Sequence, residues 1–76
     1  DGRAEALEFH IQKGSPVIGR PIKDLLLIDN LLICSIYRKG KPMIPNGQDH
    51  MEEDDLVVVV TTKKGLHDVK DILKRG

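Results

Sequence analysis

Two apolar runs near the middle of the chain set its overall pattern. Residues 31–38 and 56–62 are rich in leucine and β-branched residues, a composition that favours β-strands. The first run has apolar residues at both odd and even positions, and the second is apolar on both faces from Leu56 to Val60. A strand that is apolar on both faces must be covered on both. In so short a chain, part of that cover could be a second copy.

Regular apolar spacing predicts three further elements. From residue 6 to residue 12, apolar and polar residues alternate, which indicates a half-buried strand. Pro21, followed by apolar residues at helical spacing, predicts a short helix of about two turns. From Leu66 to Leu73, apolar residues recur every three or four positions, and this spacing predicts an amphipathic C-terminal helix.

Glycine and proline mark the turns around the first apolar run. Lys39-Gly40 has the form of a two-residue hairpin loop in which the glycine supplies a positive φ. The returning strand, residues 41–45, contains Pro42 and Pro45. Because proline cannot donate a ladder hydrogen bond, this strand is expected at the edge of a sheet.

The expected fold is therefore α+β, a small, mostly antiparallel sheet with a short helix and a C-terminal helix packed on it. The polar residues 1–5 are typical of a linker that enters a domain, so residues 6–76 are expected to form the domain itself. A domain of this size buries only about 60% of the surface that its unfolded chain exposes. Association with a second copy would supplement so small a core.

Composition and charge narrow the classes of function. Twelve Lys and Arg balance twelve Asp and Glu, so no basic field is present to concentrate nucleic acid or anionic lipid. The single cysteine, Cys34, excludes an internal disulfide and suits a reducing compartment. No apolar run approaches the roughly 20 residues that span a bilayer. We expect a soluble, cytoplasmic domain that does not bind nucleic acid.

Residues with catalytic or metal-binding chemistry do not converge in the sequence. His10, His50 and His67 lie in different elements at no metal-ligand spacing. The acidic residues 52–55 lack the surrounding pattern of a calcium-binding loop, and the scattered glycines form no phosphate-binding loop. We therefore expect no enzyme, no metal site and no cofactor within this chain.

Arg38 and a set of apolar residues are the candidates for binding. Arg38 ends the first apolar run on the same face as Ile36, and its guanidinium could hold a phosphate through two hydrogen bonds. The simpler interpretation is a solvated arginine at a strand end. Because two short helices cannot cover both faces of the sheet, we also expect a two-fold dimer. Strict alternation groups Leu32, Cys34 and Ile36 on one face, and the interface is predicted to comprise Val17, Ile18, Leu32, Cys34 and Ile36.

Five segments, taken in order, resemble the TrkA C-terminal domain family, the C-terminal half of the RCK module. They are residues 6–9, 19–25, 36–40, 44–47 and 55–59. No single segment is specific, but their order and spacing together are, and they span nearly the whole chain. Within this family the opening residues are most similar to the second such domain of TrkA potassium-uptake regulators.

The resemblance implies a regulatory domain at the inner face of the membrane that dimerises, senses a ligand and controls a potassium-transporting membrane protein. It also implies a neighbouring domain that binds NAD or another nucleotide. Some relatives bind small ligands at the dimer interface, and the resemblance then implies that Ile36, Arg38 and Pro45 contact the ligand. Relatives that bind cyclic di-AMP have a longer loop with Arg and Asn before the central strand. This chain lacks that loop, which argues against cyclic di-AMP.

A second departure from the family pattern concerns the turn before the last strand. The family usually has Gly-Asp there, and this chain has Asp54-Asp55. Aspartate tolerates left-handed backbone geometry better than most residues, so the turn is expected to survive.

Two other functions are open at this point. The chain could be an assembly domain that only dimerises its parent protein, or the internal sensor of a different transporter of anions or other ions. Specific stabilisation by a small ligand would favour sensing over assembly, because binding to the folded state alone raises its stability.

Overall fold

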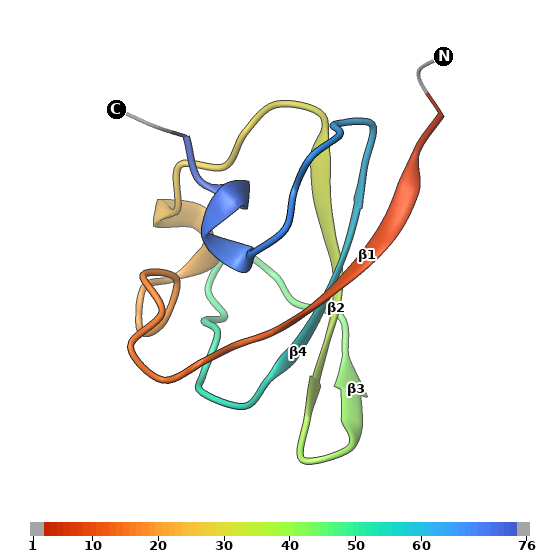
Figure 1. The fold of residues 1–76 in the computed structure, drawn as a ribbon. Helices are drawn as coiled ribbons and strands as arrows, with labels where there is room; N and C mark the ends of the chain where they lie inside the picture. The colour runs from red at the N-terminus through yellow and green to blue at the C-terminus, as the bar shows by residue number, and fades with distance from the viewer. Residues whose placement is uncertain (1–2, 75–76) are drawn as a thin grey trace.

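The computed structural model describes residues 3–74. Four strands form within that range: β1 (Glu5–His10), β2 (Leu31–Arg38), β3 (Lys41–Met43) and β4 (Leu56–Thr61). They make one sheet in the order β1-β4-β2-β3, with every neighbouring pair antiparallel (Figure 1). The two apolar runs are thus the two central strands, which confirms their prediction. Of the predicted linker, residues 1 and 2 lie outside the described range, and Glu5 already belongs to β1.

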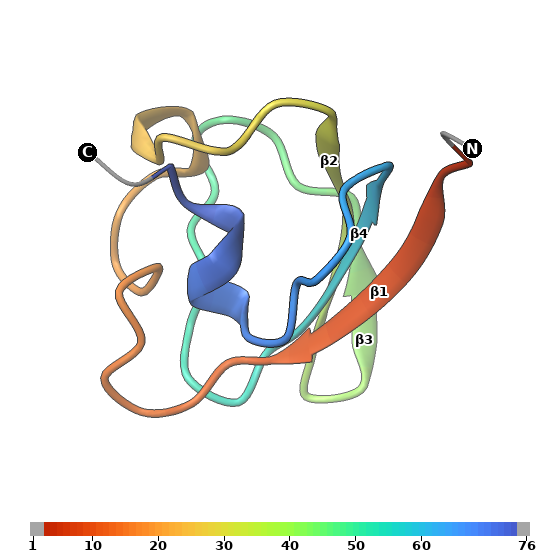
Figure 2. The same cartoon turned by 45° about the horizontal axis from the view of Figure 1, so that its top comes forward.

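The two remaining elements are single 3₁₀ turns, η1 (Ile22–Asp24) and η2 (Val69–Ile72). Both lie on the same side of the sheet, together with the loop that precedes η1 (Figures 1 and 2). The expected α+β fold is therefore wrong, because residues 3–74 contain no α-helix. In particular, the C-terminal helix predicted over Leu66–Leu73 does not form. The molecule is an antiparallel sheet covered on one face by loops and 3₁₀ turns.

Hydrogen bonds to a distant segment explain why the C-terminal helix does not form. The N–H of Ile28 donates to the carbonyl of Ile72 at 2.8 Å, and the N–H of Lys74 donates to the carbonyl of Leu26 at 2.7 Å. A helix of about two turns is too short to be stable by itself, whereas these bonds satisfy backbone groups that would otherwise need partners. Buried Val69 lies three residues before Ile72, which is the period of a 3₁₀ turn.

The shorter helix, predicted after Pro21, also stops after one turn. The N–H groups of Ile22 and Lys23 donate to the carbonyls of Asp49 (2.8 Å) and Gly47 (3.0 Å), which ties the turn to the loop after β3. Leu25 is already extended, with a ψ of 132°, and its side chain is buried. The apolar spacing therefore reflects burial of Leu25 from an extended segment rather than from a helix.

The core lies between the sheet and the segments on its covered side. In β1, Phe9 pairs with Val57 of β4, and both side chains are buried. Glu8 and His10 are exposed, so the alternation predicted for this strand is confirmed. The buried apolar residues are Phe9, Ile11, Val17, Leu25, Ile36, Met51, Val57, Val59, Val69 and Ile72.

An extra residue interrupts the pairing of β2 with β4. Ile33 pairs with Val59 and Ser35 pairs with Val58, so two steps along β2 correspond to one step along β4. Cys34 is left without a partner of its own. This two-to-one count is the signature of a β-bulge.

The bulge changes which side chains of β2 face the core. Ile36 is fully buried, whereas Leu32 is 65% exposed. In a regular strand these two residues would lie on the same face, because they are four positions apart. Leu31 and Ile33, which precede the bulge, pack against the core together with Ile36. The predicted grouping of Leu32, Cys34 and Ile36 on one face is therefore wrong, because one inserted residue reverses the alternation.

Residues with positive φ close the turns where the sequence predicts them. Lys39 and Gly40 have φ values of 53° and 77°, the geometry of a two-residue type I′ hairpin, and β2 and β3 pair directly on either side of them. The predicted edge strand is also confirmed, although β3 ends at Met43 rather than at Pro45. Asp54 has a φ of 72°, so aspartate does adopt left-handed geometry in the turn before β4.

We predict that η2 contributes to stability through Ile72. Replacing this fully buried residue with alanine removes core contacts and leaves a cavity, which is expected to lower the free energy of unfolding by about 2–5 kcal/mol. Lys70→Ala, an exposed position in the same turn, is the control and should change it by less than about 0.5 kcal/mol. Urea denaturation measures both values, and equal effects of the two substitutions would contradict the placement of η2 on the core.

Candidate functional site

Arg38, the predicted ligand contact, lies at the end of β2 and is bound to Asp55. Its Nε and Nη2 atoms donate to Oδ1 and Oδ2 of Asp55, each at 2.9 Å. Nη2 also donates to the carbonyl of His50 at 2.9 Å, and Nη1 forms an ion pair with Glu52 at 3.1 Å. A guanidinium has five N–H donors, so most of them are in use. A phosphate bound with two hydrogen bonds would have to compete with Asp55.

Asp55 is a buried carboxylate with enough partners to stay charged. Its side chain is 1% exposed and also accepts a hydrogen bond from the N–H of Glu52 at 2.8 Å. Burial raises the pKa of Asp55, but the hydrogen bonds from Arg38 and Glu52 and the charge of Arg38 outweigh it, so the pKa lies below its usual value. The hydrogen bonds to Asp55 and the negative charges of Asp55 and Glu52 raise the pKa of Arg38. The pair therefore joins the end of β2 to the turn before β4.

The other two predicted ligand residues offer no polar side-chain group. Ile36 is fully buried in the core of the chain, where a ligand outside the fold does not reach it. Pro45 follows β3 and is half-buried. The structure thus places Arg38 on the same face as Ile36, as the sequence indicates, but in a network of protein hydrogen bonds.

The uncovered face of the sheet is the larger candidate surface, and we call it the outer face. It lies opposite the side that carries η1 and η2 (Figure 2). The register assigns to it Leu32, Ser35 and Tyr37 from β2, Leu56, Val58 and Val60 from β4, and Ala6, Glu8 and His10 from β1. Leu32 is 65% exposed and Tyr37 is 40% exposed. Exposed apolar side chains gathered on one face of a sheet are typical of an interaction site.

The predicted interface residues do not all lie on the outer face. Leu32 does, and the half-buried Cys34 sits beside it at the bulge. Val17 and Ile36 are fully buried in the core, and half-buried Ile18 pairs with Met51 in a separate β-bridge. Sequence reasoning missed the β4 residues of this face, although the run of valines that is apolar on both faces was the available signal.

No group of three or more His, Cys, Asp or Glu side chains within residues 3–74 is arranged to hold a metal ion. None of the elements in the same range is a helix long and apolar enough to cross a membrane.

The sequence matches the TrkA-C domain family over residues 6–74. The chain belongs to this family. It is 35% identical over 71 residues to a Trk system potassium uptake protein TrkA homolog from Archaeoglobus fulgidus. It is 33% identical over 73 residues to one from Pyrococcus abyssi.

The match covers only part of each relative. It includes 93% of this chain but 16% of the Archaeoglobus protein, and 95% of this chain but 32% of the Pyrococcus protein. A more distant match, at 24% identity, is to 12% of a protein named K(+)/H(+) antiporter NhaP2 from Shewanella. This TrkA-C chain therefore corresponds to one part of longer transport proteins.

We predict that the stability of this TrkA-C chain depends on pH through Asp55. Since the pKa of Asp55 is lower in the folded state than its ordinary value of 3.8, its stabilising contribution is fully present above that value and is lost as pH falls through the folded pKa. The free energy of unfolding should therefore fall between about pH 5 and pH 2. Asp55→Asn should have a lower free energy of unfolding at neutral pH, and this free energy should fall less steeply as the pH is lowered.

The control for this experiment is Asp71. Its pKa is also lowered, by the N–H groups of His67 and Asp68, but its side chain lies outside the Arg38 network. Asp71→Asn should therefore retain the part of the pH dependence that comes from Asp55. Urea titrations across this range give the slopes, and a wild-type slope in Asp55→Asn would contradict the assignment.

Proposed function

We propose that this chain is a regulatory domain of a potassium uptake system. It forms a two-fold dimer through the outer face and passes the state of a bound ligand to a membrane transport protein at the cytoplasmic side. The observation that carries the proposal is the uncovered apolar outer face in a member of the TrkA-C family. The relatives named as potassium uptake proteins supply the transport context.

The chemistry of the outer face favours a second copy of the chain as its partner. Its apolar side chains come from all three outward positions of β4 and from Leu32 and Tyr37 of β2, and two-fold packing lets one patch serve both chains. A stable interface of standard size buries about 800 Å² per partner, roughly 15% of the 5225 Å² accessible surface of this chain. Most of one face of a four-stranded sheet is needed to supply that area, and sheets pack face to face through such side chains.

The proposed role is regulatory rather than catalytic. The most concentrated polar cluster near the predicted site, Arg38 with Glu52 and Asp55, is engaged in hydrogen bonds within the fold. A neighbouring domain that binds NAD or another nucleotide would supply the nucleotide chemistry in the longer parent protein.

Leu32→Asp tests the dimer without removing a core residue. Because Leu32 is 65% exposed in one chain, the substitution should leave the monomer folded, whereas at the interface it would bury an unpaired carboxylate. We expect the variant to be monomeric in sedimentation equilibrium at concentrations where the wild type is dimeric. Its circular dichroism spectrum should match that of the wild type.

Leu26→Asp is the matched control for this experiment. Leu26 is 72% exposed but follows η1 and accepts a hydrogen bond from the N–H of Lys74, just after η2. Both turns lie on the side of the sheet opposite the outer face (Figure 2). This variant should remain dimeric. The dimer would be ruled out if the wild type is monomeric at high micromolar concentration, and its location would be wrong if both variants behave alike.

Two alternatives keep specific support. An assembly domain that senses nothing would use the same outer face, and a thermal-shift screen of nucleotides and ions distinguishes it, since a sensed ligand raises the melting temperature. The relative named as a K(+)/H(+) antiporter favours the internal sensor of a different transporter. The sequence of the longer parent chain decides that case, because a transporter contains membrane-spanning segments.

A further inference from the structure

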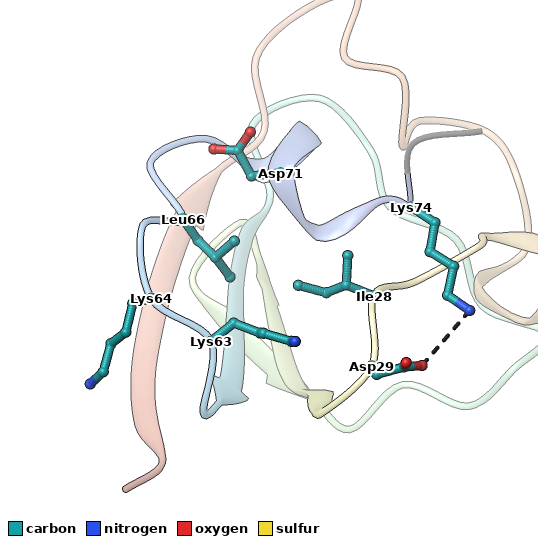
Figure 3. A pocket seen from close by; sticks show the side chains of 7 residues that line it. All are labelled: Ile28, Asp29, Lys63, Lys64, Leu66, Asp71 and Lys74. Carbon is teal, nitrogen blue, oxygen red and sulfur yellow. Dashed lines mark ion pairs between the residues drawn. The ribbon is translucent and has the colours of Figure 1, made fainter. Parts of the chain in front are cut away.

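A pocket of about 440 Å³ lies between the N-terminal approach to β2 and the C-terminal segment. The residues that line it are Ile28, Asp29, Lys63, Lys64, Leu66, Asp71 and Lys74 (Figure 3). None of the residues that line it belongs to the outer face or to the Arg38 network. The pocket is therefore a separate feature, which dimerisation through the outer face leaves open.

The floor of the pocket is apolar and held in place by the fold. The side chains of Ile28 and Leu66 point toward one another from opposite walls (Figure 3), and both are half-buried. The backbone of Ile28 is fixed by its hydrogen bond to Ile72 at 2.8 Å. This floor can accept an apolar group from a ligand without first rearranging.

Both carboxylates that line the pocket already have partners. Asp71 accepts hydrogen bonds from the N–H groups of His67 at 2.9 Å and Asp68 at 3.0 Å. Asp29 forms an ion pair with Lys74 at 3.7 Å across the rim, marked by the dashed line in Figure 3. Neither acid therefore demands a further cation.

Lys63 and Lys64 differ in the direction of their side chains and in their ion pairs. Lys64 turns away from the centre (Figure 3) and pairs with Glu5 at 2.9 Å. Lys63 reaches toward Ile28 and Asp29 (Figure 3), and its ammonium group forms no hydrogen bond or ion pair with any residue of the described range. An ammonium group without a partner thus lies beside an apolar floor.

We propose that this pocket binds a small molecule that carries one anionic group, a phosphate or a carboxylate, on an apolar body. The anionic group pairs with Lys63, and the apolar body packs on Ile28 and Leu66. Pockets that bind small molecules commonly combine an apolar lining with a few polar groups that fix orientation, and an ion pair formed beside apolar side chains is less screened than one in open solvent. The inference does not depend on potassium transport or on the dimer.

Four small probes test the two halves of the proposed ligand. Phenyl phosphate and benzoate carry both the anion and the apolar ring, whereas inorganic phosphate and phenol each carry one of them. Titrations of the ¹⁵N-labelled chain at low salt should give amide shifts at residues 28–29, 63–66 and 71–74 with phenyl phosphate or benzoate. The tighter of these two identifies the preferred anion, and both should bind more tightly than either half.

Lys63→Gln and Lys64→Gln test whether the anionic probe pairs specifically with Lys63 or is attracted by positive charge in general. Both remove one positive charge from neighbouring exposed positions. We expect Lys63→Gln to weaken binding of the tighter probe about tenfold, the scale of a hydrogen bond to a charged group. Lys64→Gln should change it by less than about twofold.

Three results would overturn the proposal. They are the absence of saturable shifts with both phenyl phosphate and benzoate, equal weakening by the two substitutions, and inorganic phosphate binding as tightly as phenyl phosphate. Sedimentation of the same samples reports the dimer independently, so failure of this site is distinguishable from failure of the proposed function.

Discussion

The β-bulge at Cys34 sets the phase of β2 and thereby decides which of its side chains face the core. Residues 31 and 33 before it and residue 36 after it all pack against the core, although a regular strand would divide them between two faces. β2 therefore contributes three apolar side chains to the core. The cost is that Leu32 is left on the outer face, so the interior and the exposed apolar surface follow from one inserted residue.

The Arg38–Asp55 pair completes this arrangement at the other end of β2. Its hydrogen bonds connect the strand end to the turn before β4, and the carbonyl of Asp55 accepts a hydrogen bond from the N–H of Ile11. Three parts of the chain thus meet at one residue, Asp55, two through its carboxylate and one through its backbone carbonyl. An unpaired buried charge is far more costly than a paired one, so the main role of Arg38 is to neutralise Asp55 and stabilise the fold. The outer face and the pocket beside Lys63 are therefore better candidates for binding than Arg38.

The strands and tight turns were predictable from local pattern, whereas the helices were not. β-Branched runs, the Lys39-Gly40 turn and the proline-containing edge strand all depend on nearby residues. The error at residues 66–73 arose because apolar spacing reports burial and not backbone conformation. Hydrogen bonds to residues 26 and 28, some 45 positions earlier, decided that conformation. The bulge was invisible for a similar reason, since it exists only in the pairing of β2 with β4.

The central claim is that the outer face, to which the bulge adds Leu32, is where two copies of the chain meet. Isotope-filtered nuclear Overhauser spectroscopy on a mixture of ¹³C-labelled and unlabelled chains tests it most directly, because the signal arises only between different protomers. The account predicts intermolecular contacts from the methyl groups of Leu32, Val58 and Val60. Intermolecular contacts from Leu26 instead, which is exposed and follows η1 on the covered side of the sheet, would contradict it.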